Sequence, residues 1–187
     1  MAGDEGDGRR EPGAQGRILV RPAVPGSDTG ALARVLADCV GGGASVGFMA
    51  PLDEARAERF WLGVLESAGS GERIVLVAQD RDSGDVVGTV QVVLQVPENQ
   101  PHRGELAKML VHRRARRRGV GEALLLAAER AARGAGKTLL VLDTASADAE
   151  RLYHRVGWRR VGVIPGYALG PRGGFVDTVV FYRDLSS

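Results

Sequence analysis

Apolar residues recur along this chain with two spacings, one typical of strands and the other typical of helices. Short apolar runs predict strands at residues 17–21, 73–79, 86–95, 105–111, 138–142, 158–164 and 176–184. Apolar positions three or four apart predict helices over about 28–40, 52–67, 120–133 and 147–156. Asp28 or Thr29 is placed to cap the first helix, and Trp61 lies on the apolar stripe of the second, so we expect Trp61 in the core.

The order of these elements predicts one α/β (α+β) domain over residues 17–187. Helices alternate with strands only in the second half, so we expect a mixed sheet with helices on both faces. The stretch 165–175 is rich in glycine and proline and is predicted to be a loop between the last two strands. Residues 1–16 are rich in glycine and charge, which predicts a disordered tail.

The composition is that of a globular protein, with 44% hydrophobic and 26% charged residues in 187. Cys39 is the only cysteine, so no internal disulfide can form and a reducing, cytoplasmic location is expected. No apolar run approaches the length needed to span a bilayer, and residues 1–16 lack the apolar core of a secretory signal. We therefore expect no membrane partner.

Residues 116–121 (RRRGVG), here called the basic-glycine turn, lie between a predicted strand and a predicted helix. Glycine lets the backbone adopt a tight turn, and the first turn of a helix presents free N–H groups to an anion. Arginine can add bidentate contacts to phosphate oxygens. These residues alone fit a phosphate site and a basic surface turn equally well. The net charge of +2 and the lack of interleaved aromatic residues argue against nucleic acid as the partner.

The basic-glycine turn resembles the acyl-CoA-binding motif of the GNAT superfamily of acetyltransferases, written Q/R-x-x-G-x-G/A. Its fixed positions are filled by Arg116, Gly119 and Gly121. Further along, AERLYHRVGW resembles the second signature of that family, A-x-x-L-Y-x-x-x-G-F/W. Its positions are filled by Leu152, Tyr153, Gly157 and Trp158. The resemblance implies a GNAT domain over residues 17–187, with a mostly antiparallel sheet of six to seven strands, and an N-acetyltransferase that uses acetyl-CoA.

The resemblance also implies a cofactor site. Backbone N–H groups from Arg118 through Glu122 would bind the pyrophosphate, and the backbone around Leu110 and Val111 would polarise the thioester where this strand splays from the next. Ser146 stands where many members have asparagine and is able to cap the following helix. The implied set is Met109, Leu110, Val111, Arg116, Arg117, Arg118, Gly119, Val120, Gly121, Glu122 and Ser146.

Three residues are candidates for proton transfer. Tyr153 occupies the family's position for the general acid that protonates the departing thiolate; the alternative is a packed tyrosine. Glu105 lies where family members often place a catalytic glutamate, and alternation puts it on one face with Ala107 and Met109; the alternative is a solvated glutamate. Asp143 is the second candidate base, and its alternative role is to cap the next turn or helix.

The acceptor is expected to be a primary amine on a small molecule. The C-terminal sequence LDTASADAERLY…VGVIPGYAL…DTVVFY resembles antibiotic- and toxin-modifying members of the family, including tabtoxin-resistance proteins. This resemblance implies that the acceptor is an amino-acid-like antibiotic or toxin and that the protein takes part in antibiotic resistance. Phe48, Tyr167 and Asp177 are candidate acceptor contacts. Acetylation of protein lysines or N-termini, or a non-catalytic acyl-CoA-binding module, are the alternatives. No Cys/His spacing predicts a metal site, and a homodimer fits the resemblance because dimers are common in the family.

Overall fold

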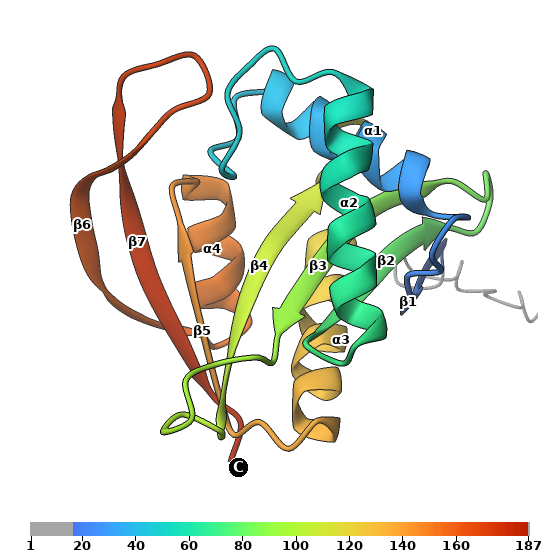
Figure 1. Ribbon diagram of the computed structural model, residues 1–187. Coiled ribbons are helices and arrows are strands. Elements are labelled where there is room, and N and C mark those ends of the chain that lie inside the picture. Colours follow the sequence, from blue (N-terminus) through green and yellow to red (C-terminus); the bar gives the residue numbers. More distant parts are fainter. Residues whose placement is uncertain (1–16, 187) are drawn as a thin grey trace, which may run out of the picture.

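In the computed structural model, which describes residues 17–186, a seven-stranded sheet forms the centre of the molecule (Figure 1). Its spatial order is β1-β2-β3-β4-β5-β7-β6, and among the neighbouring strands of residues 17–186 only β4 and β5 run parallel. The sheet is thus mixed and mostly antiparallel, as predicted. The strands are β1 Ile18–Pro22, β2 Arg73–Asp80, β3 Val86–Val93, β4 Arg103–Val111, β5 Leu139–Thr144, β6 Arg159–Leu169 and β7 Phe175–Asp184. The predicted tail, residues 1–16, lies outside the described residues.

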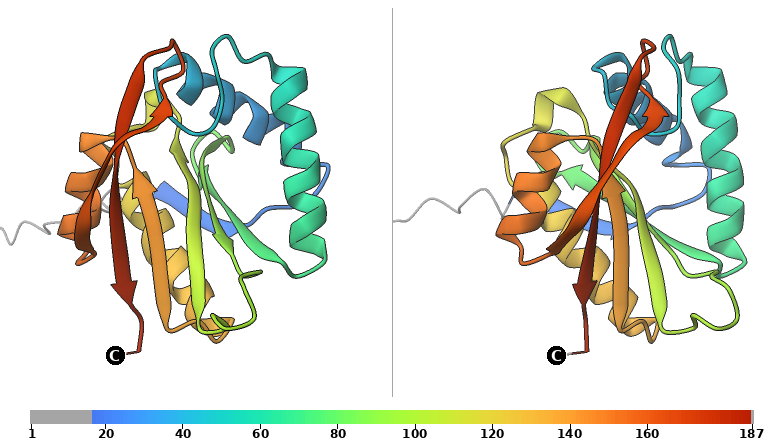
Figure 2. Two further views of the ribbon diagram at one scale, coloured as in Figure 1. Left: turned by 60° about the vertical axis from the view of Figure 1, so that its left-hand side comes forward. Right: turned by 90° about the vertical axis from the view of Figure 1, so that its left-hand side faces the viewer.

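Two helices cover each face of the sheet (Figure 2). One face carries α1 and α2, and the other carries α3 and α4, with a short 3₁₀ turn η2 before α3. Their bounds are α1 Thr29–Gly41, α2 Glu54–Gly69, η2 Arg113–Ala115, α3 Val120–Gly134 and α4 Ala147–Arg155. Within residues 17–186 no helix is long and apolar enough to cross a membrane. The number and order of these elements confirm the prediction.

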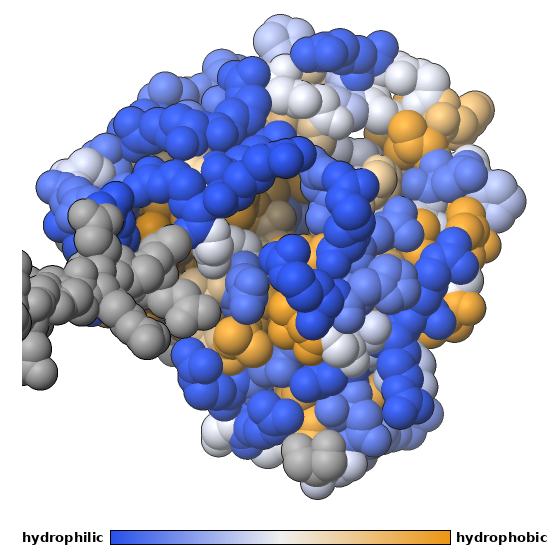
Figure 3. All heavy atoms as spheres, turned by 180° about the vertical axis from the view of Figure 1, so that it is seen from behind, coloured by the Kyte–Doolittle hydropathy of each residue, from blue (hydrophilic) through white to orange (hydrophobic). Residues whose placement is uncertain are grey.

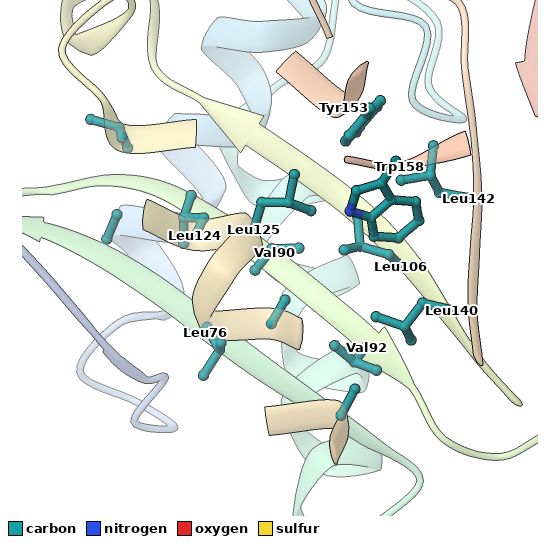
Figure 4. Packing of buried hydrophobic residues seen from close by; sticks show 14 of the residues in the cluster. Leu76, Val90, Val92, Leu106, Leu124, Leu125, Leu140, Leu142, Tyr153 and Trp158 are labelled. Atoms are coloured by element: carbon teal, nitrogen blue, oxygen red, sulfur yellow. The ribbon is translucent and has the colours of Figure 1, made fainter. Parts of the chain in front are cut away.

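The core has two layers because alternate residues of the central strands point to opposite faces. On the α3–α4 side, apolar residues of both helices pack on strands β2 to β5 (Figure 4); they include Leu76, Val90, Leu106, Leu124, Leu125, Leu140 and Tyr153. On the α1–α2 side, the packed residues include Leu32, Leu36, Trp61, Val75, Val77 and Leu110. Trp61 is fully buried, so the prediction that it belongs to the core is confirmed.

The start of α1 differs from the prediction. Asp28 is the N-cap residue, but its side chain accepts no hydrogen bond from the helix. Its carboxylate instead accepts two hydrogen bonds from the Arg21 guanidinium, at 2.7 and 2.9 Å, and one from the Val24 backbone N–H, at 2.7 Å. The Thr29 hydroxyl is buried and has no partner within residues 17–186. A charged partner in β1 therefore takes the carboxylate that the helix would otherwise use.

The loop predicted at 165–175 is shorter than expected. Strand β6 continues to Leu169, and the register of its pairing with β7 shifts between Ile164 and Ala168 to accommodate Pro165 and Gly166. Because β6 is the edge strand, the missing N–H of Pro165 breaks no bond to a further strand. Tyr167 accordingly lies in a strand.

Candidate functional site

Strands β4 and β5 separate after three paired positions. Their parallel register runs from Arg103–Leu139 to Glu105–Val141, beyond which the strands diverge (Figure 1). The region beyond the Glu105–Val141 pair is called the β4–β5 fork below. The backbone of β4 in this region has no partner strand on its β5 side, so its polar groups are open to a ligand. The predicted splaying of these strands is confirmed.

Strand β4 contains a bulge inside the fork. Thr89 pairs with Leu110 and Gln91 with Ala107, so Lys108 and Met109 together oppose one residue of β3. The extra residue reverses the alternation, because Leu106 packs with the α3–α4 layer whereas Leu110 packs with the α1–α2 layer. Met109 packs against the α3–α4 layer. The prediction that it shares a face with Glu105 and Ala107 is therefore wrong, and the bulge is the reason.

The basic-glycine turn has the backbone of an anion site. Gly119, the N-cap residue of α3, has a φ of 77°, and Arg117 has a φ of 60°. Within residues 17–186, no hydrogen bond is donated by the backbone N–H groups of residues 118–122. These free N–H groups stand at the positive end of the helix dipole, where an anion is stabilised.

Three of the arginines around this turn are already paired with aspartates. The N–O distances are 2.8 to 2.9 Å, and the pairs are Arg113–Asp38, Arg114–Asp85 and Arg118–Asp80. Arg116 and Arg117 are exposed and have no acidic partner in the part of the chain that the structure describes. The Nε of Arg116 donates to the Val111 carbonyl oxygen at 3.3 Å. The guanidinium groups available to a phosphate are therefore those of Arg116 and Arg117.

The two motif glycines are required for different reasons. At Gly119 a Cβ would meet no atom within 4 Å, so the positive φ is what favours glycine there. At Gly121 a Cβ would lie 2.9 Å from Cδ2 of Leu152 and 3.6 Å from Cε of Met109. Gly121 thus lets the first turn of α3 pack closely on α4 and β4.

Tyr153 is held in the core by aromatic neighbours (Figure 4). It is 3% exposed, and its ring centroid lies 5.8 Å from that of Trp158 and 5.6 Å from that of Phe181. Trp158 is fixed in turn by a hydrogen bond of 2.8 Å from its Nε1 to the buried Glu129 carboxylate. Burial, and then the negative charge of Asp143, raise the pKa of the Tyr153 phenol well above its usual value. The phenol therefore stays protonated and can donate a hydrogen bond.

The two candidate carboxylates differ in their surroundings. Glu105 is half-exposed, and its nearest cation is Nη1 of Arg103 at 4.0 Å. Asp143 lies within β5, and its Oδ2 accepts a hydrogen bond of 2.7 Å from Oγ1 of Thr178 in β7. Within residues 17–186 the Asp143 carboxylate accepts no backbone N–H of a turn or helix, so that alternative is wrong. Ser146 caps α4 instead, with its Oγ accepting from Ala149 N at 3.3 Å.

The three predicted acceptor contacts lie on two segments. Phe48 packs edge-to-face on Phe60 of α2, with ring centroids 5.1 Å apart. Tyr167 is 55% exposed on β6. Asp177 accepts a hydrogen bond of 2.9 Å from Gly166 N, which holds the irregular part of β6. The structure thus gives Asp177 a local partner that the sequence did not indicate.

These two segments are bonded to each other. The Ala50 backbone N–H donates to the Pro171 carbonyl oxygen at 2.8 Å, and Arg172 Nη2 donates to the Gly41 carbonyl oxygen at 2.8 Å. The loop after α1 and the turn between β6 and β7 therefore form a continuous bridge.

Sequence reasoning missed two polar residues at the fork, Thr178 and Lys108. Thr178 is in a strand remote in sequence from Asp143, and no spacing connects them. Lys108 would be assigned to the α3–α4 face by simple alternation, because nothing in the sequence reveals the bulge.

The described residues offer no metal site, and their surface depression lies apart from the fork. No group of three or more His, Cys, Asp or Glu residues within 17–186 is arranged to hold a metal ion. A surface depression of about 230 Å³ shares no residue with the fork or the basic-glycine turn; it is lined by Ala31, Arg34, Val35, Asp85, Val86, His112 and Arg114.

Known structures share this architecture. A GCN5-related N-acetyltransferase from Kribbella flavida is 25% identical, with a TM-score of 0.75 over 91% of this chain and 99% of its own. A ribosomal-protein-alanine N-acetyltransferase from Brucella melitensis is 25% identical, with a TM-score of 0.74 over 89% of this chain and 99% of its own. A phosphinothricin acetyltransferase from Sinorhizobium meliloti, in complex with AcCoA, is 20% identical, with a TM-score of 0.76 over 90% of this chain and 88% of its own.

A sequence model of the acetyltransferase (GNAT) family matches residues 46–158, more than half of the chain. The matched span contains the bulged strand β4, the basic-glycine turn and the signature that ends at Trp158. The predicted fold and enzyme class are thereby confirmed, and the chain belongs to the GNAT family of acetyltransferases.

Proposed function

We propose that this protein transfers an acetyl group from acetyl-CoA to a primary amine of a small molecule by direct attack on the thioester. The observation that carries the proposal is the placement of two features on one strand-turn-helix segment. Strand β4 opens at the fork, and the turn that follows it presents free N–H groups beside Arg116 and Arg117. This order matches the two ends of acetyl-CoA, a thioester at the strand and a pyrophosphate at the turn.

The proposed reaction needs four contributions from the chain. The N–H groups of residues 118–122 bind the pyrophosphate, and the open backbone of residues 109–111 polarises the thioester carbonyl. The acceptor ammonium gives a proton to Glu105 or Asp143, and the amine nitrogen attacks the carbonyl carbon. The carbon–sulfur bond then breaks, and the departing thiolate is stabilised and takes a proton from the Tyr153 phenol. The second proton of the attacking nitrogen restores the phenol, which leaves an amide and the free thiol of CoA. Ser146 holds α4, which carries that phenol.

The acceptor is proposed to be an amino-acid-like antibiotic or toxin. The bridge between the loop after α1 and the β6–β7 turn supports a small acceptor, because a bridged end limits access for a folded chain. Phe48 and Tyr167 lie on its two sides. The similarity to a phosphinothricin acetyltransferase is consistent with this acceptor.

Protein acetylation is the second candidate. It is supported by the similarity to a ribosomal-protein-alanine N-acetyltransferase, at the same level of fold similarity. A third candidate, a non-catalytic module that binds acyl-CoA, would use the same basic-glycine turn and need neither carboxylate. Turnover on peptide substrates, or binding of acetyl-CoA without any turnover, would favour these candidates.

A homodimer formed through the β6–β7 hairpin is also proposed. Strand β6 is the edge of the sheet, and the hairpin exposes apolar side chains along the side of the molecule seen at the right of Figure 3; they are Val161, Val163, Ile164, Leu169 and Phe175. Light scattering should give twice the monomer mass, and V161D should restore the monomer. A cytoplasmic location stays a prediction from the lone cysteine.

The proposed activity is tested by mixing the protein, acetyl-CoA and a panel of amines, amino acids and peptides, and following the release of free thiol. Mass spectrometry of the acceptors identifies the acetylated product. Thiol release that depends on a small amine supports the proposal. Release that requires a peptide supports protein acetylation, and acetyl-CoA binding without release on any acceptor supports the non-catalytic module.

A further inference from the structure

Lys108 has a strained backbone conformation at the fork. Its φ is 48°, a left-handed value that favours glycine, and it is the first of the two bulge residues that oppose Val90. Bulges re-aim side chains, and strain of this kind persists where the surrounding structure holds it, often at functional sites. The strained position therefore makes Lys108 a candidate functional residue.

The bulge turns Lys108 away from the α3–α4 layer of the core and toward the α1–α2 side. Without it, Lys108 would follow Leu106 onto the α3–α4 face of the sheet, where an ammonium would be buried among apolar residues. With it, Nζ of Lys108 lies 5.7 Å from the ring centroid of Phe60 on α2. A Cβ on Gly47 would be 3.9 Å from the same Nζ. Lys108 thus points to the face that carries Phe48 and the loop after α1.

The Lys108 ammonium is half-buried, and no hydrogen bond or ion pair to it is found within residues 17–186. Burial lowers its pKa, the negative charges of Asp143 and Glu105 act to raise it, and the positive charge of Arg73 adds to the lowering. The Phe60 ring provides a weak cation–π contact but accepts none of its three N–H donors. A half-buried ammonium of this kind is best satisfied by an oxyanion.

The charges at the fork therefore have both signs. Asp143 and Glu105 suit the ammonium of an acceptor amine, while Lys108 would repel an acceptor that carries only positive charge. An acceptor that carries a carboxylate as well as an amine satisfies both groups.

We infer that Lys108 binds the carboxylate of the acceptor and selects zwitterionic, amino-acid-like amines over amines without an acid group. The inference rests on the proposed N-acetyltransferase function and assigns a specificity-determining residue to it. The acceptor's amine faces Asp143 and Glu105, and its carboxylate faces Lys108.

The test compares pairs of acceptors that differ only in this group. L-α-amino acids and their carboxamides are assayed for thiol release, and kcat/KM is taken as a ratio within each pair. Four proteins are compared: wild type, Lys108→Met, Lys108→Gly and Lys108→Arg. Glycine adopts a positive φ freely, so Lys108→Gly removes the ammonium while easing the backbone. The amine of an amino acid and the amine of its carboxamide differ in basicity, but this difference is the same for every protein. It therefore cancels when the ratio of each variant is compared with that of wild type.

We expect wild type to prefer the amino acid over its carboxamide in each pair that it accepts. Lys108→Met and Lys108→Gly should lose about tenfold or more of that preference, mainly through a higher KM for the amino acid. Lys108→Arg should keep most of it, because arginine also binds carboxylates. Binding of CoA should be unchanged in all four. The matched control is Arg56→Met, which removes an exposed cation lying 5.7 Å from the Phe48 ring, and it should keep the preference.

The outcomes separate the inference from the function on which it rests. Turnover of amines with the same preference in wild type, Lys108→Met and Lys108→Gly overturns the inference and leaves the function standing. Loss of preference in Arg56→Met alone overturns it as well. If Lys108→Arg and Lys108→Met both lose the same activity on the amino acid as on its carboxamide, Lys108 acts as a base. That result overturns carboxylate binding. The absence of turnover on every amine overturns the function and the inference together.

Discussion

Oγ1 of Thr178 donates a hydrogen bond of 2.7 Å to Oδ2 of Asp143 across the β5–β7 pair. Thr178 is 2% exposed whereas Asp143 is exposed, so only the threonine end of the bond is shielded from water. Within residues 17–186 no other side-chain hydrogen bond reaches this carboxylate. One oxygen is thus held in place while the other stays open to an acceptor ammonium. The pair gives Asp143 a fixed orientation that the half-exposed Glu105 lacks.

Thr178→Val should therefore weaken the use of the acceptor. Losing a hydrogen bond to a charged group costs about 1.5 kcal/mol or more, which corresponds to roughly a tenfold fall in kcat/KM for the acceptor. Thr178→Ser keeps the hydroxyl and should stay near wild type. Acceptor kinetics at saturating acetyl-CoA measure the effect. Equal values for valine and serine variants would mean that Asp143 contacts no acceptor.

The pairing of the arginines leads to a prediction about CoA. Arg116→Ala and Arg117→Ala should each weaken CoA binding about tenfold, because each removes a charge-assisted contact to phosphate. Arg114→Ala is the control, since its guanidinium is bound to Asp85. Calorimetric titration measures the affinity of each variant for CoA and for 3′-dephospho-CoA. An equal loss of affinity for both ligands locates the effect at the pyrophosphate, which both contain. Weaker binding in Arg114→Ala alone would place the phosphates elsewhere.

The Arg21–Asp28 pair predicts how stability depends on pH. The hydrogen bond from Arg21 is the main reason that the pKa of Asp28 is below its ordinary value of 3.8. A lowered folded-state pKa contributes stability above the unfolded-state pKa, and this contribution is lost as pH falls through the folded-state value. Asp28→Asn should lower the free energy of unfolding by about 2 kcal/mol at neutral pH.

Denaturant unfolding of wild type and Asp28→Asn at several pH values is the measurement. The difference between the two proteins should shrink as pH falls below about 4. A difference that is constant from neutral to acidic pH would show that the carboxylate charge contributes nothing.

Cys39 should not disturb an assay that follows free thiol. It is 2% exposed, and burial raises the pKa of its thiol above the ordinary value of 9.0, so little reactive thiolate forms at neutral pH. We expect slow labelling of the native protein by a thiol reagent and fast labelling after unfolding in denaturant. Fast labelling of the native protein would show that α1 opens, because Cys39 lies on the buried face of that helix.

Periodicity predicted the elements of this fold because each helix and strand buries a regular apolar face. The stripe on α2 placed Trp61 in the core, and the turn chemistry of residues 116–121 located the start of α3. Departures came where a tertiary partner changed a local preference. Arg21 takes the Asp28 carboxylate away from the helix, and an edge position lets β6 continue through Pro165.

The candidate site was harder to predict than the fold. Motif residues such as Gly119 and Tyr153 have local signatures, and the structure places Gly119 at the start of α3 and Tyr153 on the buried face of α4, where the charge of Asp143 acts on its phenol. The bulge puts Lys108 and Met109 each on the face opposite to the one that alternation predicts, and it depends on the pairing of β4 with β3, which no local pattern contains. The Thr178–Asp143 bond likewise joins strands that are distant in sequence.

The central claim is that this site transfers an acetyl group and that Tyr153 and Glu105 take part. Two variants, one at each of these residues, test it most directly. Thiol release and the acetylated acceptor are quantified for wild type, Tyr153→Phe and Glu105→Gln, with Glu98→Gln, at an exposed loop carboxylate, as the control. We predict that kcat falls about 100-fold in each fork variant, with CoA affinity unchanged and Glu98→Gln at the wild-type rate. Full activity in both Tyr153→Phe and Glu105→Gln would contradict the account.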